Sequence, residues 1–178
     1  LKNFLVNRLL YILKMGAAIW MVMLSCQPQS KESGKGKQEV SFLEEITVSQ
    51  MQEDLRNGKY TITDVVKEYL DRIDCLDRNG PELNSIIHVN PDALQIAEEL
   101  DREMEAGKIR GPMHGIPVIL KDNIDTHDKM PTTAGSLALI GSYPLQDSWV
   151  AKKLRESGAV IIAKANLSEW ANFRADFS

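Results

Sequence analysis

The chain has 178 residues, of which 43% are hydrophobic and 26% are charged, and its formal net charge is −4. This length is enough for one domain with a sizeable core, and the composition is ordinary for a folded domain. The charge is uneven, because residues 1–41 carry a net charge of +4 and residues 42–178 a net charge of −8. An acidic body argues against nucleic-acid binding, which needs a basic face.

The first 26 residues have the pattern of an export signal. Basic residues precede the apolar run MGAAIWMVML (residues 15–24), which is too short to span a bilayer comfortably. Ser25 and Cys26 follow, and the segment resembles a bacterial lipoprotein signal, although Leu24 lies one position nearer the cysteine than is usual. In such signals the cysteine becomes the lipidated first residue. We therefore expect an exported lipoprotein anchored to the bacterial cell envelope through Cys26, with an uncleaved anchor helix as the alternative.

A polar segment separates this signal from the rest of the chain. Residues 27–39 read QPQSKESGKGKQE and contain no apolar residue. Such a composition cannot bury a core, and it predicts a flexible tether over residues 27–41. The expected organisation is a signal over 1–26, this tether, and a folded region over 42–178.

Two helices are expected at the start of the folded region. The first covers residues 47–57 and ends at Gly58. The second begins with Thr61 and Asp64, which are spaced as a capping pair. Its apolar residues recur at helical spacing and end before Asn79-Gly80-Pro81; they are Val65, Val66, Tyr69, Leu70 and Ile73.

The remaining pattern alternates extended and helical segments. Residues 83–89 are expected to be extended, and Asn90 is expected to cap a helix that has Pro91 at its first position and ends at Gly107. The elements expected after it are a strand over 116–120, a loop over 122–136, a helix over 147–157, a strand over 159–163 and a helix, LSEWANF, capped by Asn166. The order indicates an α/β fold with a mainly parallel sheet, and the fully apolar run over 116–120 indicates an interior strand.

The sequence offers no metal or cofactor site. His88, His114 and His127 are scattered, and none has a partner at metal-ligand spacing. No GxGxxG or GxxxxGK[ST] phosphate-binding pattern is present, and the acidic residues lie on expected outer helix faces. We therefore expect no metal and no cofactor.

Lys121 is the one residue whose position is unusual. It follows the apolar run IPVIL and precedes Asp122-Asn123 within GPMHGIPVILKDNID. A lysine at the end of a strand usually reaches solvent, because burying its charge is costly. The alternative is a buried catalytic base. A lysine takes up a proton only when neutral, and burial favours the neutral form.

Three segments together resemble the amidase signature family: GPMHGIPVILKDNID, then TTAGS at residues 132–136, then DSWVAKKLRESGAVIIAKANLSEWA at residues 147–171. The helix TITDVVKEYLDRID and the segment ELNSIIHV are also similar to that family. The resemblance runs from about Phe42 to Ser178. It implies the N-terminal part of the amidase signature fold, in which helices pack on a mixed, mainly parallel central sheet.

The resemblance also implies a mechanism. Family members are serine hydrolases with a Ser–Ser–Lys triad, in which the lysine corresponding to Lys121 is the base for a bridging serine that activates a nucleophilic serine. The substrate would be a small-molecule amide, with no cofactor. Lys164 is similar to a structural position of the family. The family's serines lie in a GGSSGGS-type loop that these 178 residues lack, so the chain is expected to be inactive by itself.

Two alternatives stay open. The A-type subunit of the glutamyl-tRNA amidotransferase belongs to the same family but is cytoplasmic, and the signal ending at Cys26 argues against it. A lipoprotein whose incomplete α/β domain only binds a ligand or a partner is the other alternative. A GGSSGGS-like loop encoded after Ser178 would favour the amidase.

Overall fold

A computed structural model describes residues 41–171 of the chain. The expected signal over residues 1–26, its Cys26, and the tether up to residue 40 lie outside the described residues, so the expectations for them stay predictions. Within residues 41–171, no helix is both long enough and apolar enough to cross a lipid bilayer.

The α-helices of the described region lie close to their expected positions. α2 (Val48–Arg56) and α3 (Ile62–Arg72) come first, and α4 (Ala93–Glu105) and α5 (Trp149–Glu156) follow. A π-helical segment, η1 (Ile73–Arg78), extends α3 and ends directly before Asn79-Gly80-Pro81, where the sequence predicts an end. The helices therefore follow from local apolar periodicity and from turn residues.

The beginning of α3 confirms the predicted capping pair and is fixed to a second helix. Thr61 Oγ1 accepts a hydrogen bond from Asp64 N at 3.0 Å, and the Asp64 carboxylate accepts one from Thr61 N at 3.0 Å. Ile62 N and Thr63 N donate to the carboxylate of Asp101 in α4 at 2.7 and 2.9 Å. The first three N–H groups of α3 therefore all have acceptors, which helix ends otherwise lack.

α4 begins later than the sequence predicts. The structure places Asp92, and not Asn90, directly before α4, and residues 91–92 form a turn. The buried Asn90 side chain is used differently, since Nδ2 donates to Ile161 O at 2.8 Å and Oδ1 accepts from Asp92 N at 3.0 Å. Asn90 thus ties the start of this helix to the sheet.

The sheet has three strands in the described region. β1 (Ile86–Val89), β2 (Pro117–Lys121) and β3 (Val160–Ala165) are arranged in the order β1-β3-β2. β3 is central, parallel to β2 and antiparallel to β1. The predicted strands are confirmed within a few residues, and the sheet is mixed.

β2 occupies an edge of the described sheet, so the prediction of an interior strand is wrong for these residues. Only β3 pairs with β2 within residues 41–171. Ile119 is 42% exposed, and its neighbours Pro117 and Val118 are half-buried. Within the described sheet, β2 therefore has a neighbouring strand along one edge only, whereas a strand with this apolar composition usually has neighbouring strands along both edges.

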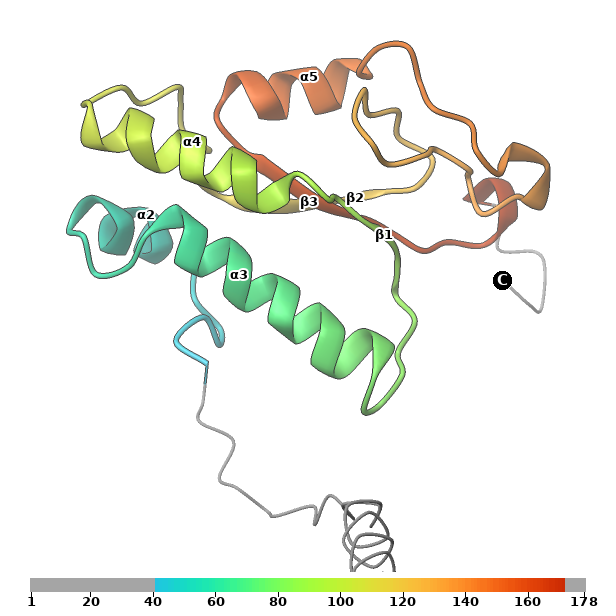
Figure 1. The fold of residues 1–178 in the computed structure, drawn as a ribbon, viewed down its shortest axis with the longest axis horizontal. Helices are drawn as coiled ribbons and strands as arrows, with labels where there is room; N and C mark the ends of the chain where they lie inside the picture. Colours follow the sequence, from blue (N-terminus) through green and yellow to red (C-terminus); the bar gives the residue numbers. More distant parts are fainter. Residues whose placement is uncertain (1–40, 172–178) are drawn as a thin grey trace, which may run out of the picture. The chain divides into compact units, whose positions relative to one another are not determined.

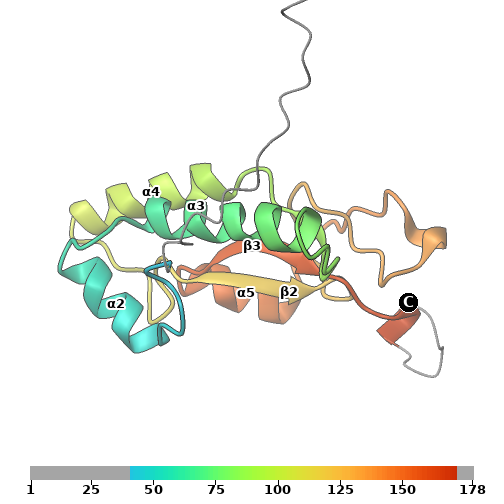
Figure 2. The same ribbon diagram turned by 90° about the horizontal axis from the view of Figure 1, so that it is seen from below.

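Helices cover both faces of the sheet. α3 and α4 pack on one face and α5 packs on the other, as Figures 1 and 2 show. The larger core lies on the side of α3 and α4, and its buried residues include Val65, Val66, Ala97, Leu100 and Ile162. The smaller core lies under α5 and consists of Leu120, Met130, Ala151 and Ile161.

The predicted helix LSEWANF is not an α-helix in its described part. Asn166 Oδ1 accepts a hydrogen bond from Leu167 N at 2.9 Å, but only a 3-10 turn, η3 (Glu169–Ala171), follows. Trp170 has a φ of 55° inside this turn, and its N–H donates to Ala134 O at 2.7 Å. This hydrogen bond to a distant loop takes the place of the bond that Trp170 N would donate to a preceding carbonyl in an α-helix.

Candidate active site

The candidate site lies where β2 and β3 end. These strands are parallel, and Lys121 pairs with Ala165, so the carboxyl ends of both strands lie at the same end of the sheet (Figure 2). Functional residues of open α/β sheets commonly lie beyond the carboxyl ends of parallel strands. Lys121 is the last residue of β2, and the connection over residues 122–136 begins directly after it.

Lys121 itself is exposed in the described part of the chain. Burial at the end of an apolar strand is the expected source of a neutral lysine; residues 41–171 do not provide that burial, and the role of Lys121 as a base stays a prediction. Lys121 is in register with Ala165, whereas the buried Leu120 and Lys164 are in register with each other, so Lys121 lies on the opposite face of the sheet. In addition, β2 has no second neighbouring strand within the described residues. Any burial of Lys121 must therefore come from other parts of the protein.

Asp122, the next residue, is fully buried and held by several hydrogen bonds. Its Oδ2 accepts hydrogen bonds from Thr133 N at 3.0 Å and from Thr133 Oγ1. Its backbone N–H donates to Ala165 O at 3.1 Å, and its carbonyl accepts from Ala134 N at 3.0 Å. A carboxylate without exposure needs such donors, because burying a charge is costly. Asp122 thus fixes the backbone directly after Lys121.

Lys164, in β3, is the buried lysine of the described region. Its side chain is 0% exposed, and Nζ donates to Ile124 O at 2.7 Å and to Thr132 Oγ1 at 3.0 Å. Burial lowers the pKa of Lys164, and the carboxylates around it, led by Asp122, oppose this effect. Lys164 follows the apolar run AVIIA, just as Lys121 follows IPVIL, so the sequence alone does not indicate which of the two lysines is buried.

His88 joins this buried group from the opposite strand. It is the direct partner of Lys164 in the antiparallel pairing of β1 and β3. Burial lowers the pKa of His88, the charge of Asp122 opposes this, and the charge of Lys164 adds to it. Within residues 41–171, neither His88 Nε2 nor Asp122 Oδ1 has a hydrogen-bond partner, although both atoms are buried. From the sequence, His88 is tested only as a metal ligand, which does not reveal this grouping.

The other two histidines have separate positions. His114 is buried, with Nε2 3.1 Å from Leu100 O and Nδ1 accepting from Arg110 N at 3.2 Å. His127 is exposed, and its Nδ1 lies 2.9 Å from Pro144 O. Among residues 41–171, no three His, Cys, Asp or Glu side chains are grouped as metal ligands.

The TTAGS segment closes the candidate site on a second side. Ser136 Oγ donates to Glu169 Oε1 at 2.6 Å, which connects this segment to the residues after β3. Gly135 has a φ of +69°, and a Cβ there would lie 2.8 Å from Leu167 O. Only glycine fits so close a backbone approach. The three sequence segments KDN, TTAGS and KANLSE thus meet in one place.

Comparison with known proteins accounts for this meeting of segments. Residues 64–175, more than half of the chain, match the Amidase family. The chain belongs to the amidase family. It is 54% identical over 134 residues to a Schizosaccharomyces pombe protein whose name places it among the amidases. Over 127 residues it is 40% identical to the A-type subunit of the chloroplastic/mitochondrial glutamyl-tRNA(Gln) amidotransferase of Zea mays.

Solved amidase structures confirm the α/β fold of the amidase signature family for this region. The native peptide amidase from Stenotrophomonas maltophilia is 48% identical and superposes with a TM-score of 0.72 over 75% of this chain. The match covers 27% of that enzyme, and 22% of the Schizosaccharomyces pombe protein. This amidase-family chain therefore spans about a quarter of the length of its relatives.

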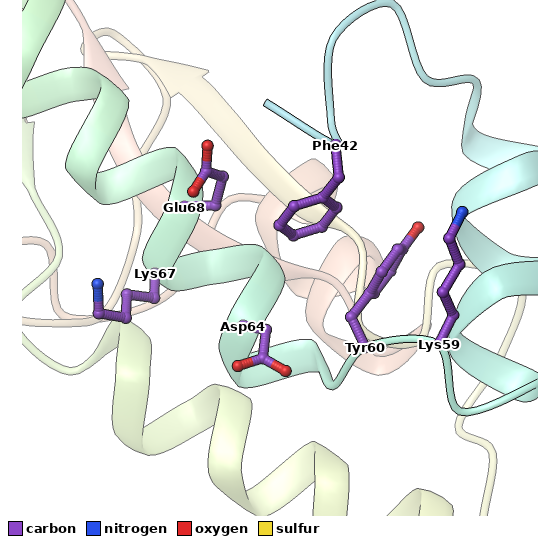
Figure 3. Close-up of a pocket in the computed structure, with 6 residues that line it drawn as sticks. All are labelled: Phe42, Lys59, Tyr60, Asp64, Lys67 and Glu68. Carbon is purple, nitrogen blue, oxygen red and sulfur yellow. The ribbon is translucent and has the colours of Figure 1, made fainter. Parts of the chain in front are cut away.

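A surface hollow lies away from the candidate site of this amidase-family chain, beside the beginning of α3 (Figure 3). The rings of Phe42 and Tyr60 pack there at 4.8 Å between centroids. Tyr60 donates to Asp54 at 3.1 Å, and burial raises the pKa of Tyr60 to about 12. Most polar groups of the hollow are engaged by neighbours, so it holds no catalytic set; its lining residues are Phe42, Lys59, Tyr60, Asp64, Lys67 and Glu68.

Proposed function

We propose that this chain supplies the N-terminal part of an amidase that hydrolyses a carboxylic amide C–N bond, with Lys121 as the general base. The observation that carries the proposal is the contact between the KDN, TTAGS and KANLSE segments around the end of β2. Lys121 stands at this meeting point, and its exposed side chain is free to face a further part of the enzyme. The substrate is a small-molecule amide, and no cofactor takes part.

The proposed chemistry is an acyl transfer to serine. Neutral Lys121 accepts a proton from a bridging serine, which in turn takes the proton of the nucleophilic serine. The serine oxygen attacks the amide carbonyl, the C–N bond breaks as the amine takes up a proton, and water hydrolyses the acyl-enzyme. A free lysine has a pKa of about 10.4 and is charged at neutral pH. The enzyme must therefore enclose Lys121 further than residues 41–171 do.

The serines are proposed to come from sequence beyond these 178 residues. Gly135-Ser136 and Gly141-Ser142 do not match a GGSSGGS-type loop, and Ser136 is already bonded to Glu169. The 178-residue chain by itself is therefore expected to show no amide hydrolysis.

The test begins with the reading frame after the codon for Ser178. A frame that encodes a GGSSGGS-type loop allows the complete protein to be expressed and assayed with a panel of N-acyl p-nitroanilides and peptide amides. Turnover by the complete protein, with none by residues 1–178, would support the proposal. A stop codon at this position would leave the non-catalytic binding domain as the better explanation, and a complete protein inactive on every amide would contradict the proposed amidase.

A second candidate is an A-type subunit of the glutamyl-tRNA amidotransferase. Identities of 36–40% to subunits with that name favour it, but those of 46–54% to the amidase-named relatives are higher. An A-type subunit would need partner subunits for transamidation of Glu-tRNA. Hydrolysis of free amides by the purified complete protein alone would support the amidase over this candidate.

We also propose that Cys26 is lipidated and anchors the protein to the bacterial cell envelope. The support is the basic, apolar and small-residue pattern that ends at Cys26. Expression in a bacterial host with radiolabelled palmitate should label the wild-type chain and not Cys26→Ala. Equal labelling of the two, or none of the wild type, would contradict the anchor.

A further inference from the structure

We propose that Lys164 is a positioning residue. It clamps the connection over residues 122–136 to β3 and thereby fixes the direction in which the Lys121 side chain projects from the end of β2. Its effect on catalysis rests on the proposed function of Lys121. The clamp itself is a property of the described chain and can be tested without any enzyme activity.

The first step is that one ammonium group holds both ends of the connection. Lys164 Nζ donates to Ile124 O, near the start of the connection, and to Thr132 Oγ1, near its end. The two acceptors are separated by seven intervening residues in the sequence but share this single donor. Opening either end would leave a buried ammonium with too few acceptors, which is costly.

The second step carries this restraint to Lys121. Asp122 is bonded to Ala165 of β3 through its backbone N–H and to the TTAGS segment through its carbonyl and its carboxylate. Thr132 precedes Thr133, whose N–H and hydroxyl donate to Asp122. The hydrogen bond from Lys164 to Thr132 therefore also restrains Thr133 and Ala134, which donate hydrogen bonds to Asp122. Asp122 is the next residue after Lys121, so the restraint reaches Lys121.

The third step is the charge balance of the buried group. Asp122 and Lys164 are both 0% exposed, and the negative charge of Asp122 acts on the Lys164 ammonium without a direct salt bridge between these two described side chains. Asp125 and Asp128 add negative charge around Lys164, Arg155 adds positive charge, and His88 faces it from β1. Removing the ammonium leaves the Asp122 carboxylate without its buried counter-charge.

An alternative role for Lys164 is simple space filling. Methionine has a similar unbranched length and fills the same volume, but it cannot donate to Ile124 O or Thr132 Oγ1 and carries no charge. Lys164→Met therefore separates the two roles. Thr132→Val is the milder variant, because it removes one acceptor and keeps the shape of the side chain.

The first test is hydrogen–deuterium exchange on the 178-residue chain, read peptide by peptide. Lys164→Met should speed exchange in residues 122–136 at least tenfold relative to α3, and Thr132→Val should do so to a smaller extent. Lys153→Met, at an exposed position of α5, is the matched control and should change neither region. Unchanged exchange over 122–136, or equal acceleration there and in α3, would overturn the clamp.

The second test uses the complete amidase. Misplacing a catalytic group by about 1 Å can cost about 10²-fold in rate. Lys164→Met should therefore lower kcat by about 10²-fold and Thr132→Val by a smaller factor, both with little change in KM and with an altered pH profile of kcat. A folded variant with wild-type kcat and pH profile would overturn the positioning role. An inactive wild-type enzyme would instead contradict the proposed function, and the exchange experiment would still decide the clamp.

Discussion

Lys121 and Lys164 lie near the ends of two paired parallel strands, yet Lys164 is fully buried and Lys121 is exposed. The two lysines lie on opposite faces of the sheet, because Lys164 is in register with the buried Leu120 and Lys121 with Ala165. Their strands also differ in their neighbours. β3 has neighbours on both sides, whereas β2 has β3 alone within the described sheet. A lysine after an apolar strand is thus buried or exposed according to the face that it occupies and the strands beside it, and the apolar run itself does not decide the outcome.

The first prediction concerns Lys121→Ala. In the complete enzyme this change should lower kcat roughly 10²- to 10⁴-fold, the range of a lost general base. Because the side chain is exposed here, the urea midpoint of the 178-residue chain should not change. Steady-state kinetics and urea unfolding measure the two effects. Lys153→Ala is the control and should retain activity. Wild-type turnover by Lys121→Ala would remove Lys121 from the mechanism.

The helices could be predicted from the sequence because their determinants are local. Thr61 and Asp64 cap α3 three residues apart, as their spacing indicates. The later start of α4 could not be predicted in this way, since Asn90 bonds to Ile161, far along the chain. The 3-10 turn at Trp170 has the same kind of cause, a hydrogen bond to the distant Ala134.

The candidate site was predictable only in part. Resemblance to a family identified Lys121, whereas its exposure depends on which strands lie beside β2. The grouping of His88, Asp122 and Lys164 depends on strand order and register, which no periodicity in the sequence specifies. The ionisable residues of this buried group come from three separate segments, and only the fold brings them together.

The second prediction concerns Asp101, which joins α4 to the beginning of α3. Its carboxylate accepts hydrogen bonds from Ile62 N, Thr63 N and Thr63 Oγ1. Asp101→Ala removes all three and should lower the free energy of unfolding by about 2–3 kcal/mol, measured by urea denaturation. Asp71→Ala, on the exposed face of α3, is the control and should leave the urea midpoint unchanged. Equal midpoints for the two variants would contradict this role of Asp101.

The third prediction concerns His88 and pH. Burial lowers the pKa of His88 in the folded chain, so below a pH of about 6.5 the unfolded chain binds a proton that the folded chain does not. The stability that depends on neutral His88 is therefore fully present above about pH 6.5, and it is lost as the pH falls through the pKa of His88 in the folded chain. Urea midpoints between pH 7.5 and 5 should decline in the wild type and decline less in His88→Gln.

The control for this pH dependence is the exposed histidine of the loop. His127→Gln should keep the wild-type slope of midpoint against pH. Carboxylates with lowered pKa values, such as those of Asp77 and Glu103, are present in all three proteins, so their contributions cancel when the slopes are compared. A His88→Gln slope equal to that of the wild type would show that His88 does not make this contribution.

The fourth prediction compares two glycines that share a left-handed backbone and differ in their surroundings. Gly158 has a φ of +89°, and a Cβ added there would lie 2.7 Å from His114 Cα. Gly141 has a φ of +79°, and a Cβ added there would have no atom within 4 Å apart from its own chain neighbours. Alanine at either position carries the left-handed cost of about 1–2 kcal/mol. Gly158→Ala must in addition displace backbone between α5 and β3, which adds about 1–3 kcal/mol. In urea denaturation, Gly158→Ala should therefore lose more free energy of unfolding than Gly141→Ala. Equal losses would mean that the turn relaxes without disturbing His114.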